Sequence, residues 1–256
     1  MQSNRLQLNT NKSELLWCAT ARRRHQLPRC PFRIEPDTII PSTAVRDLGI
    51  YIDSDLSMQV HVQRSVAGCF AVLRQLRSIR RFVPSFMYQS LVVALLSRLD
   101  YGNATLAGLP ASLLNRLQSV INAAARSIAG LRRSEHITDA LASFHWLRAP
   151  ESIKFKLAVI VYRALHGTMP RYLSDQLQYV ADLPSRRRGR LRSSTSSLLD
   201  VRPSRLVTVG DHSFATAGPR LWNSLPVDVQ SAPSLTTFRH KLKTHLFRQS
   251  YPDIVL

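Results

Sequence analysis

The chain is poor in cysteine, in glycine and in long apolar runs. Its three cysteines, Cys18, Cys30 and Cys69, are too few and too widely spaced for a disulfide framework, which predicts reduced thiols in an intracellular protein. Nine glycines form neither a G-x-x-x-x-G-K loop nor a G-x-G-x-x-G fingerprint. The longest apolar run, residues 91–96, is far shorter than the roughly 20 residues of a membrane-spanning helix. These absences argue against a disulfide-stapled domain, a phosphate-loop or dinucleotide fold, and a helical membrane span.

Catalytic motifs are missing as well. The sequence has no H-E-x-x-H, no pair of C-x-x-C motifs, no two histidines at i and i+4, and no G-x-S-x-G. Cys18, His25 and Cys30 lack a fourth ligand at zinc-finger spacing. Asp53 and Asp55 form a close carboxylate pair, but they lie between a predicted strand and a predicted helix, where acids accept hydrogen bonds from backbone amides. We therefore predict no metal site and no complete active site.

Acidic residues are scarce relative to basic ones. Lys and Arg number 35 against 16 Asp and Glu, a net charge of +19, and 30 of the 35 are arginine. The planar arginine fork pairs with two phosphate oxygens at once, so the composition favours a nucleic-acid partner. The alternative is a compositional preference for arginine with the charge merely solvated. No helix pairs a clean basic face with a broad aromatic one, so we expect no membrane partner.

Hydrophobic residues make up 45% of the chain, enough for a folded core, so a wholly disordered basic tail is excluded. The patterns predict an α+β, mostly α, fold. Residues 1–56 carry prolines and short apolar runs that predict two or three short strands. One predicted strand is Val45–Asp53, with Leu48, Ile50 and Ile52 on one face.

From Ser57 onward the apolar spacing becomes helical. Residues 57–182 are predicted to form helices, 183–210 a flexible basic loop, and 211–256 a C-terminal segment with an amphipathic helix. The predicted helices run from a cap at Ser57 to Pro84, then 85–99, 110–130, 138–146, 150–166 and 234–247. Leu235, Phe238, Leu242 and Leu246 should face inward in the last of these helices. Leu and Val on nearly all sides of 85–99 predict that this helix is buried.

Arg74, Arg77 and Arg81 fall at i, i+3 and i+7 on the first long helix. This spacing predicts one shared face, with Phe70 and Leu73 pointing elsewhere. No acid lies between Arg64 and Arg81, which favours phosphate contact over an ordinary solvated face.

A second basic cluster lies in the predicted loop. It consists of Arg186, Arg187, Arg188, Arg190 and Arg192. Such a run suits RNA binding or nuclear import, and the alternative is a solvated linker. Tyr101, Trp146 and Trp222 have the rings needed to stack on bases, but their apolar neighbours favour packing inside the protein.

Several motifs, in order along the chain, resemble the C-terminal part of reverse transcriptases from non-LTR (LINE-type, Jockey-like) retrotransposons. These enzymes are the RNA-directed DNA polymerases of mobile elements. The similar segments are Leu6-Gln7-Leu8-Asn9 with Lys12-Ser13-Glu14, Leu48-Gly49-Ile50-Tyr51-Ile52-Asp53, Leu99-Asp100-Tyr101-Gly102-Asn103, Gly108-Leu109-Pro110, residues 117–126 (LQSVINAAAR), His145-Trp146-Leu147, residues 214–219, Leu221-Trp222-Asn223-Ser224-Leu225-Pro226 and residues 238–247. The order of these motifs, more than any one of them, carries the resemblance.

The resemblance implies that residues 1–56 are the end of a palm and that residues 57–182 begin with a thumb. The metal-binding carboxylates of the family's F/Y-A-D-D strand would precede residue 1. Polymerisation uses two divalent ions on those carboxylates, so Mg²⁺ belongs to the complete polymerase and the chain alone is predicted to be inactive and without a cofactor. Lys12 aligns with a lysine near the polymerase active site, and the alternative is a surface lysine beside a strand.

The implied partners are RNA and DNA in the form of a template–primer, together with the missing N-terminal part of the polymerase. The implied location is the nucleus, the cytoplasm or both. Two alternatives remain open at this stage: a reverse transcriptase that is active as part of a longer polypeptide, and an inert relic of a decayed element. The sequence carries no pattern that predicts an oligomeric state.

Overall fold

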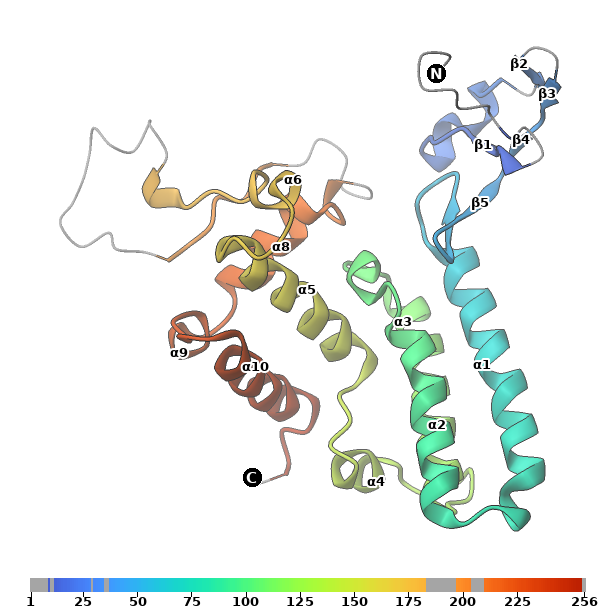
Figure 1. The fold of residues 1–256 in the computed structure, drawn as a ribbon, viewed down its shortest axis with the longest axis vertical. Helices are drawn as coiled ribbons and strands as arrows, with labels where there is room; N and C mark the ends of the chain where they lie inside the picture. Colours follow the sequence, from blue (N-terminus) through green and yellow to red (C-terminus); the bar gives the residue numbers. More distant parts are fainter. Residues whose placement is uncertain are drawn as a thin grey trace. The chain divides into compact units, whose positions relative to one another are not determined.

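The computed structural model describes residues 9, 12–28, 30–34, 37–182, 197–203 and 210–254. The chain forms two compact units, residues 1–64 and 65–256 (Figure 1). It is mostly helical with a few short strands, which confirms the predicted α+β, mostly α, class. The boundary between the units falls inside the first long helix, and the four-part division made from the sequence stays a prediction.

The first unit contains short paired strands. In its described residues there are six of them, more than the two or three predicted. β1 (Leu15–Leu16) pairs in parallel with β4 (Pro41–Ser42), and β2 (Phe32–Ile34) pairs antiparallel with β3 (Asp37–Ile39). β5 (Ala44–Asp47) pairs antiparallel with β6 (Ile50–Asp53), and a short 3-10 helix, η3, covers Ala21–Gln26.

The single strand predicted over Val45–Asp53 is wrong, because the chain reverses in its middle. Leu48 and Gly49 have φ angles of 45° and 86° and form a two-residue turn, so that Val45 pairs with Ile52. Two successive positive φ angles match the right-handed twist of a hairpin. Leu48 is 83% exposed at the tip and does not share a buried face with Ile50 and Ile52. Alternation fixes the period of a strand but not the point where the chain turns back.

The first long helix, α1 (Gln59–Ile79), begins in the first unit and continues into the second. The second unit then contains, in chain order, η4 (Arg80–Phe82), α2 (Ser85–Asp100), η5 (Asn103–Leu106), α3 (Ala111–Ala129), α4 (Thr138–Ser143), α5 (Ala149–Leu165), α6 (Arg171–Ser174), η6 (Val180–Asp182), α8 (Phe214–Asn223), α9 (Val227–Gln230) and α10 (Leu235–Ser250). The six helices predicted from spacing are all present. Among the described helices, none has both the length and the hydrophobicity needed to cross a membrane.

Local capping signals explain why several helix ends were predicted closely. Pro110 precedes α3, and Gly130 ends it with φ 73° while its N–H donates to the Arg126 carbonyl. At α10 the Ser234 hydroxyl accepts a hydrogen bond from the Thr237 N–H at 3.2 Å. Glycine at a left-handed C-terminal position and serine at an N-terminal cap are the residues that these geometries favour.

The main core of the second unit lies between α5, α8 and α10, and α5 runs alongside α10 in Figure 1. Phe238 stacks on Tyr162 with ring centroids 4.3 Å apart and on Trp222 at 5.9 Å. The Tyr162 hydroxyl donates to the Ala232 carbonyl at 3.0 Å, so the buried phenol is satisfied. Leu242 and Leu246 are also buried and Leu235 is half-buried, which confirms the predicted inner face of the last helix.

Helix α2 corrects a prediction, because only one of its sides is buried. The buried side chains are those of Tyr88, Val92, Leu95 and Leu99, at three- and four-residue steps. On the other side Phe86 is 66% exposed and Val93 is 45% exposed. An all-round apolar composition predicts burial only when neighbours surround the helix. In the described part of the second unit, α2 is covered on one side alone.

This one-sided burial predicts opposite outcomes for two substitutions on α2. Leu95→Ala removes a buried side chain and should lower the free energy of unfolding by about 2–5 kcal/mol. Phe86→Ala changes an exposed side chain and should shift it by about 0.5 kcal/mol or less. Urea unfolding followed by circular dichroism measures both. Equal losses would mean that the outward side of α2 is buried in solution.

Candidate nucleic-acid interface

The paired acids Asp53 and Asp55 lie at the start of α1. One Asp53 carboxylate oxygen accepts hydrogen bonds from the Val60 N–H at 3.2 Å and from the Ser57 hydroxyl at 2.9 Å. Asp55 accepts from the Ser57 N–H at 3.1 Å. The two carboxylates therefore satisfy amide groups at a helix N-terminus, which confirms the structural interpretation of the pair. The predicted cap, Ser57, accepts from the N–H of Gln59, the first residue of α1, at 3.4 Å, and Asp53 accepts from the next amide, that of Val60.

A buried histidine lies in the first turn of α1, close to Asp53. His61 is 6% exposed, and one of its ring nitrogens accepts from the Tyr51 N–H at 3.4 Å. Burial lowers the pKa of His61, and the neighbouring Asp53 carboxylate partly opposes that shift. Within the described residues no cluster of three or more His, Cys, Asp or Glu side chains is arranged to hold a metal ion. The sequence prediction that the chain carries no cofactor stays a prediction.

The arginine stripe predicted from spacing lies on an exposed surface. Arg74 and Arg77 belong to α1 and Arg81 to η4, the 3-10 turn that follows it, and all three are exposed. Arg77 donates to the Ala123 carbonyl of α3 at 3.4 Å. Its neighbour Arg80 donates to the Ile128 carbonyl at 3.5 Å and lies over the Tyr88 ring, with its guanidinium carbon 5.6 Å from the ring centroid. Arg77 and Arg80 thus fasten the end of α1 to α3.

One aromatic residue belongs to the stripe, contrary to the prediction. Phe70 precedes Arg74 by four residues, so helical geometry puts both on one face, and Phe70 is 36% exposed. Leu73 does point elsewhere, since it is only 1% exposed. An exposed ring next to guanidinium groups offers a stacking surface for a base. We call Phe70, Arg74, Arg77 and Arg81 the α1 stripe.

Acidic side chains are remote from this surface in the sequence. Residues 56–99 contain six arginines and no Asp or Glu. In the described part of the chain the ion pairs are Lys154–Glu151 and Arg220–Asp211, and neither involves the stripe. The arginine charges of the stripe are therefore not neutralised by carboxylates of the described residues. Such a surface attracts a polyanion.

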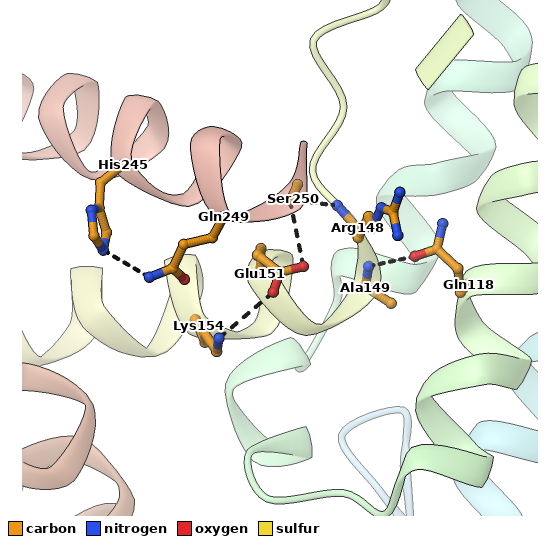
Figure 2. A network of polar contacts seen from close by, with 8 residues as sticks. All are labelled: Gln118, Arg148, Ala149, Glu151, Lys154, His245, Gln249 and Ser250. Atoms are coloured by element: carbon orange, nitrogen blue, oxygen red, sulfur yellow. Dashed lines mark hydrogen bonds and ion pairs between the residues drawn. The ribbon is translucent and has the colours of Figure 1, made fainter. Parts of the chain in front are cut away.

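A polar network joins α3, α5 and α10 (Figure 2). Gln118 of α3 accepts from the Ala149 N–H at 2.8 Å at the start of α5. Ser250, the last residue of α10, accepts from the Arg148 N–H and donates to Glu151, both at 3.4 Å. These contacts satisfy amide groups at the N-terminus of α5 and connect three helices. We assign the network a structural role.

The remaining groups of Figure 2 lie along the α5–α10 contact. Lys154 pairs with Glu151 at 3.6 Å, and Gln249 bonds the His245 ring at 3.0 Å. Beside them the Arg148 guanidinium lies over the Tyr251 ring, 5.3 Å from its centroid. Burial raises the pKa of Tyr251 to about 12, although the charge and hydrogen bond of Arg148 act in the opposite direction. The Tyr251 hydroxyl donates to the Trp146 carbonyl at 2.7 Å, so the phenol stays protonated and ties the end of α10 to the segment after α4.

The other predicted site residues fall in different places. Lys12 is exposed in the first unit, whereas the α1 stripe belongs to the second. Arg186, Arg187, Arg188, Arg190 and Arg192 lie outside the described residues. Trp222 is buried against Phe238, as packing predicted, and Trp146 packs on Phe144 with ring centroids 5.3 Å apart. Tyr101 is 55% exposed, so packing alone does not describe it.

A second group of cations was missed by the sequence analysis. Lys156 on α5 and Arg239 and Lys243 on α10 line one cavity of the second unit. The sequence carries only a partial signal: four of the five lysines fall at 154, 156, 241 and 243, and two of these, Lys156 and Lys243, line the cavity. Their convergence depends on the packing of α5 against α10, which the sequence pattern does not specify.

Comparisons of the chain with protein-family models, with curated proteins and with solved structures find no match.

Proposed function

We propose that the chain is a nucleic-acid-binding module that contacts a sugar–phosphate backbone through the α1 stripe. The observation that carries this proposal is the exposure of Arg74, Arg77 and Arg81, together with Phe70, on a stretch of chain without acids. Phosphate contacts by arginine fix register on a strand but carry no base information. Binding is therefore weakly sequence-specific.

The anchoring of the α1 stripe supports this role. The hydrogen bond from Arg77 to the Ala123 carbonyl fixes one of its terminal nitrogens and leaves the other N–H groups of the guanidinium to face a ligand. A side chain that is already oriented loses less conformational entropy when it binds. Arg74 on α1 and Arg81 on the following turn η4 flank it in the sequence and are also exposed, so they extend the charge on both sides of Arg77.

The motif resemblance suggests which protein the module belongs to and which nucleic acid it binds. We propose that the module is the C-terminal portion of a retrotransposon RNA-directed DNA polymerase, that its ligand is a template–primer, and that α1 acts as a thumb helix. Nucleotide addition in the family uses Mg²⁺ held on the carboxylates of an F/Y-A-D-D strand, a motif that residues 1–256 do not contain, so the role proposed for this chain is binding. The module functions in the nucleus or the cytoplasm, wherever its template–primer is present.

A salt titration tests the proposal. Binding to duplex DNA, to an RNA–DNA hybrid and to single-stranded RNA is measured by fluorescence anisotropy across a range of salt concentrations. If about five phosphates are neutralised, the logarithm of affinity should fall against the logarithm of salt with a slope of about −4.5 on duplex DNA, because counterions are released. A slope near zero with both RNA and DNA would refute phosphate-led binding.

A further inference from the structure

The second unit contains a cavity of about 470 Å³ lined by residues of α2, α3, α5 and α10 and of the segment after α4. Much of its wall is apolar, with Leu96 from α2, Ile121 from α3, Trp146 from the segment after α4 and Phe155 from α5. A mostly apolar concave surface with a few converging polar groups is the usual form of a small-molecule site.

Three cations converge on this cavity from two helices. Arg239 and Lys243 lie four residues apart on α10 and therefore share a face, and Lys156 comes from α5. All three are exposed. The neighbouring lysines are used elsewhere: Lys154 pairs with Glu151 at 3.6 Å, and Lys241 donates to the Asp228 carbonyl at 2.9 Å.

Only one carboxylate lines the described wall of the cavity. Asp100 accepts hydrogen bonds from the Asn103 side-chain amide at 2.9 Å and from the Ser152 hydroxyl at 3.1 Å. The charge of Asp100 is thus already stabilised by these two hydrogen bonds. The three cations outnumber it, so the cavity favours an anionic ligand.

We propose that this cavity binds a small amphiphilic anion, with an apolar acyl or ring body against Leu96, Ile121 and Phe155. A carboxylate, sulfonate or phosphate head is then held by Lys156, Arg239 and Lys243. Burial of the apolar body supplies the non-directional part of the affinity, and charge-assisted hydrogen bonds to the head orient it. This site is separate from the α1 stripe and does not depend on nucleic-acid binding.

Calorimetric titration of the full chain with octanoate, octanol and inorganic phosphate tests both halves of the ligand. Octanoate should bind saturably with one site per chain, and both octanol and phosphate should bind at least about tenfold more weakly, because each lacks one half of the interaction. An ω-brominated octanoate should also quench the fluorescence of Trp146, which lines the cavity. Trp146→Phe should abolish that quenching.

A charge-matched pair of variants separates the site from the general positive charge. R239Q/K243Q should weaken octanoate binding about tenfold. K154Q/K241Q removes the same amount of charge from α5 and α10 outside the cavity wall and should leave binding unchanged. Ser97 is exposed and lines the cavity, so Ser97→Phe should obstruct the ligand in a chain whose circular dichroism is unchanged. The proposal is overturned if octanoate does not saturate, if phosphate binds as tightly as octanoate, or if both double variants lose binding equally.

Discussion

Replacing Phe238 by alanine should lower the free energy of unfolding by about 3–5 kcal/mol. The Phe238 side chain is 0% exposed, and its ring stacks on Tyr162 and Trp222. It comes from α10 and lies between side chains of α5 and α8, so its removal leaves a cavity where three helices meet. The surrounding rings cannot collapse fully into such a space, and the lost transfer energy and the cavity cost add together.

Urea unfolding monitored by circular dichroism and by tryptophan fluorescence measures this loss. Phe82→Ala is the matched control, because Phe82 is 85% exposed and its removal should change stability by about 0.5 kcal/mol or less. Phe238→Leu keeps an apolar side chain in the core and should fall between the two. If Phe238→Ala costs no more than Phe82→Ala, the packing of α10 on α5 and α8 is wrong.

Local signals made much of this fold predictable, and tertiary context decided the rest. Both limits of α3 and the start of α10 followed from Pro110, Gly130 and Ser234, whose backbone preferences act within one turn. α8 escaped notice because Gly218 and Pro219 interrupt its pattern, although both are buried inside the helix. The Cβ position of Gly218 would lie 3.1 Å from a Val161 methyl carbon of α5, which explains why a small residue stands there. Only the packed structure supplies that reason.

The candidate functional residues also divide into those that local spacing predicts and those that only helix packing brings together. The arginines of the α1 stripe were predicted because helical spacing puts Arg74 and Arg77 on one face, and Arg81 follows in the turn η4. Phe70 was assigned to the wrong face although the same spacing rule, applied four residues earlier, places it beside Arg74. The cavity cations could not be grouped from sequence, since Lys156 and Lys243 are 87 residues apart and meet through helix packing. Residues on one helix are therefore more predictable as a site than residues on two.

Neutralising the α1 stripe should have the largest effect on nucleic-acid affinity. In the triple variant R74Q/R77Q/R81Q three phosphate contacts are lost, so the slope of log affinity against log salt on duplex DNA should become shallower by about 2.7. Affinity at low salt should fall at least about tenfold. Anisotropy titrations of wild type and variant over the same salt range measure both quantities. An unchanged slope would show that the stripe does not meet phosphate.

The control for the triple variant is R171Q/R202Q/R248Q, which removes the same charge from three other exposed arginines of the second unit. If binding depended only on net charge, both variants would lose affinity equally. If binding depends on the α1 stripe, the control variant should keep most of the wild-type slope of log affinity against log salt. Arg77→Lys refines the comparison, because lysine keeps the charge but lacks the planar fork that bonds the Ala123 carbonyl while facing a phosphate. That variant should retain the salt slope and still bind more weakly, since the charge remains and the orientation is lost.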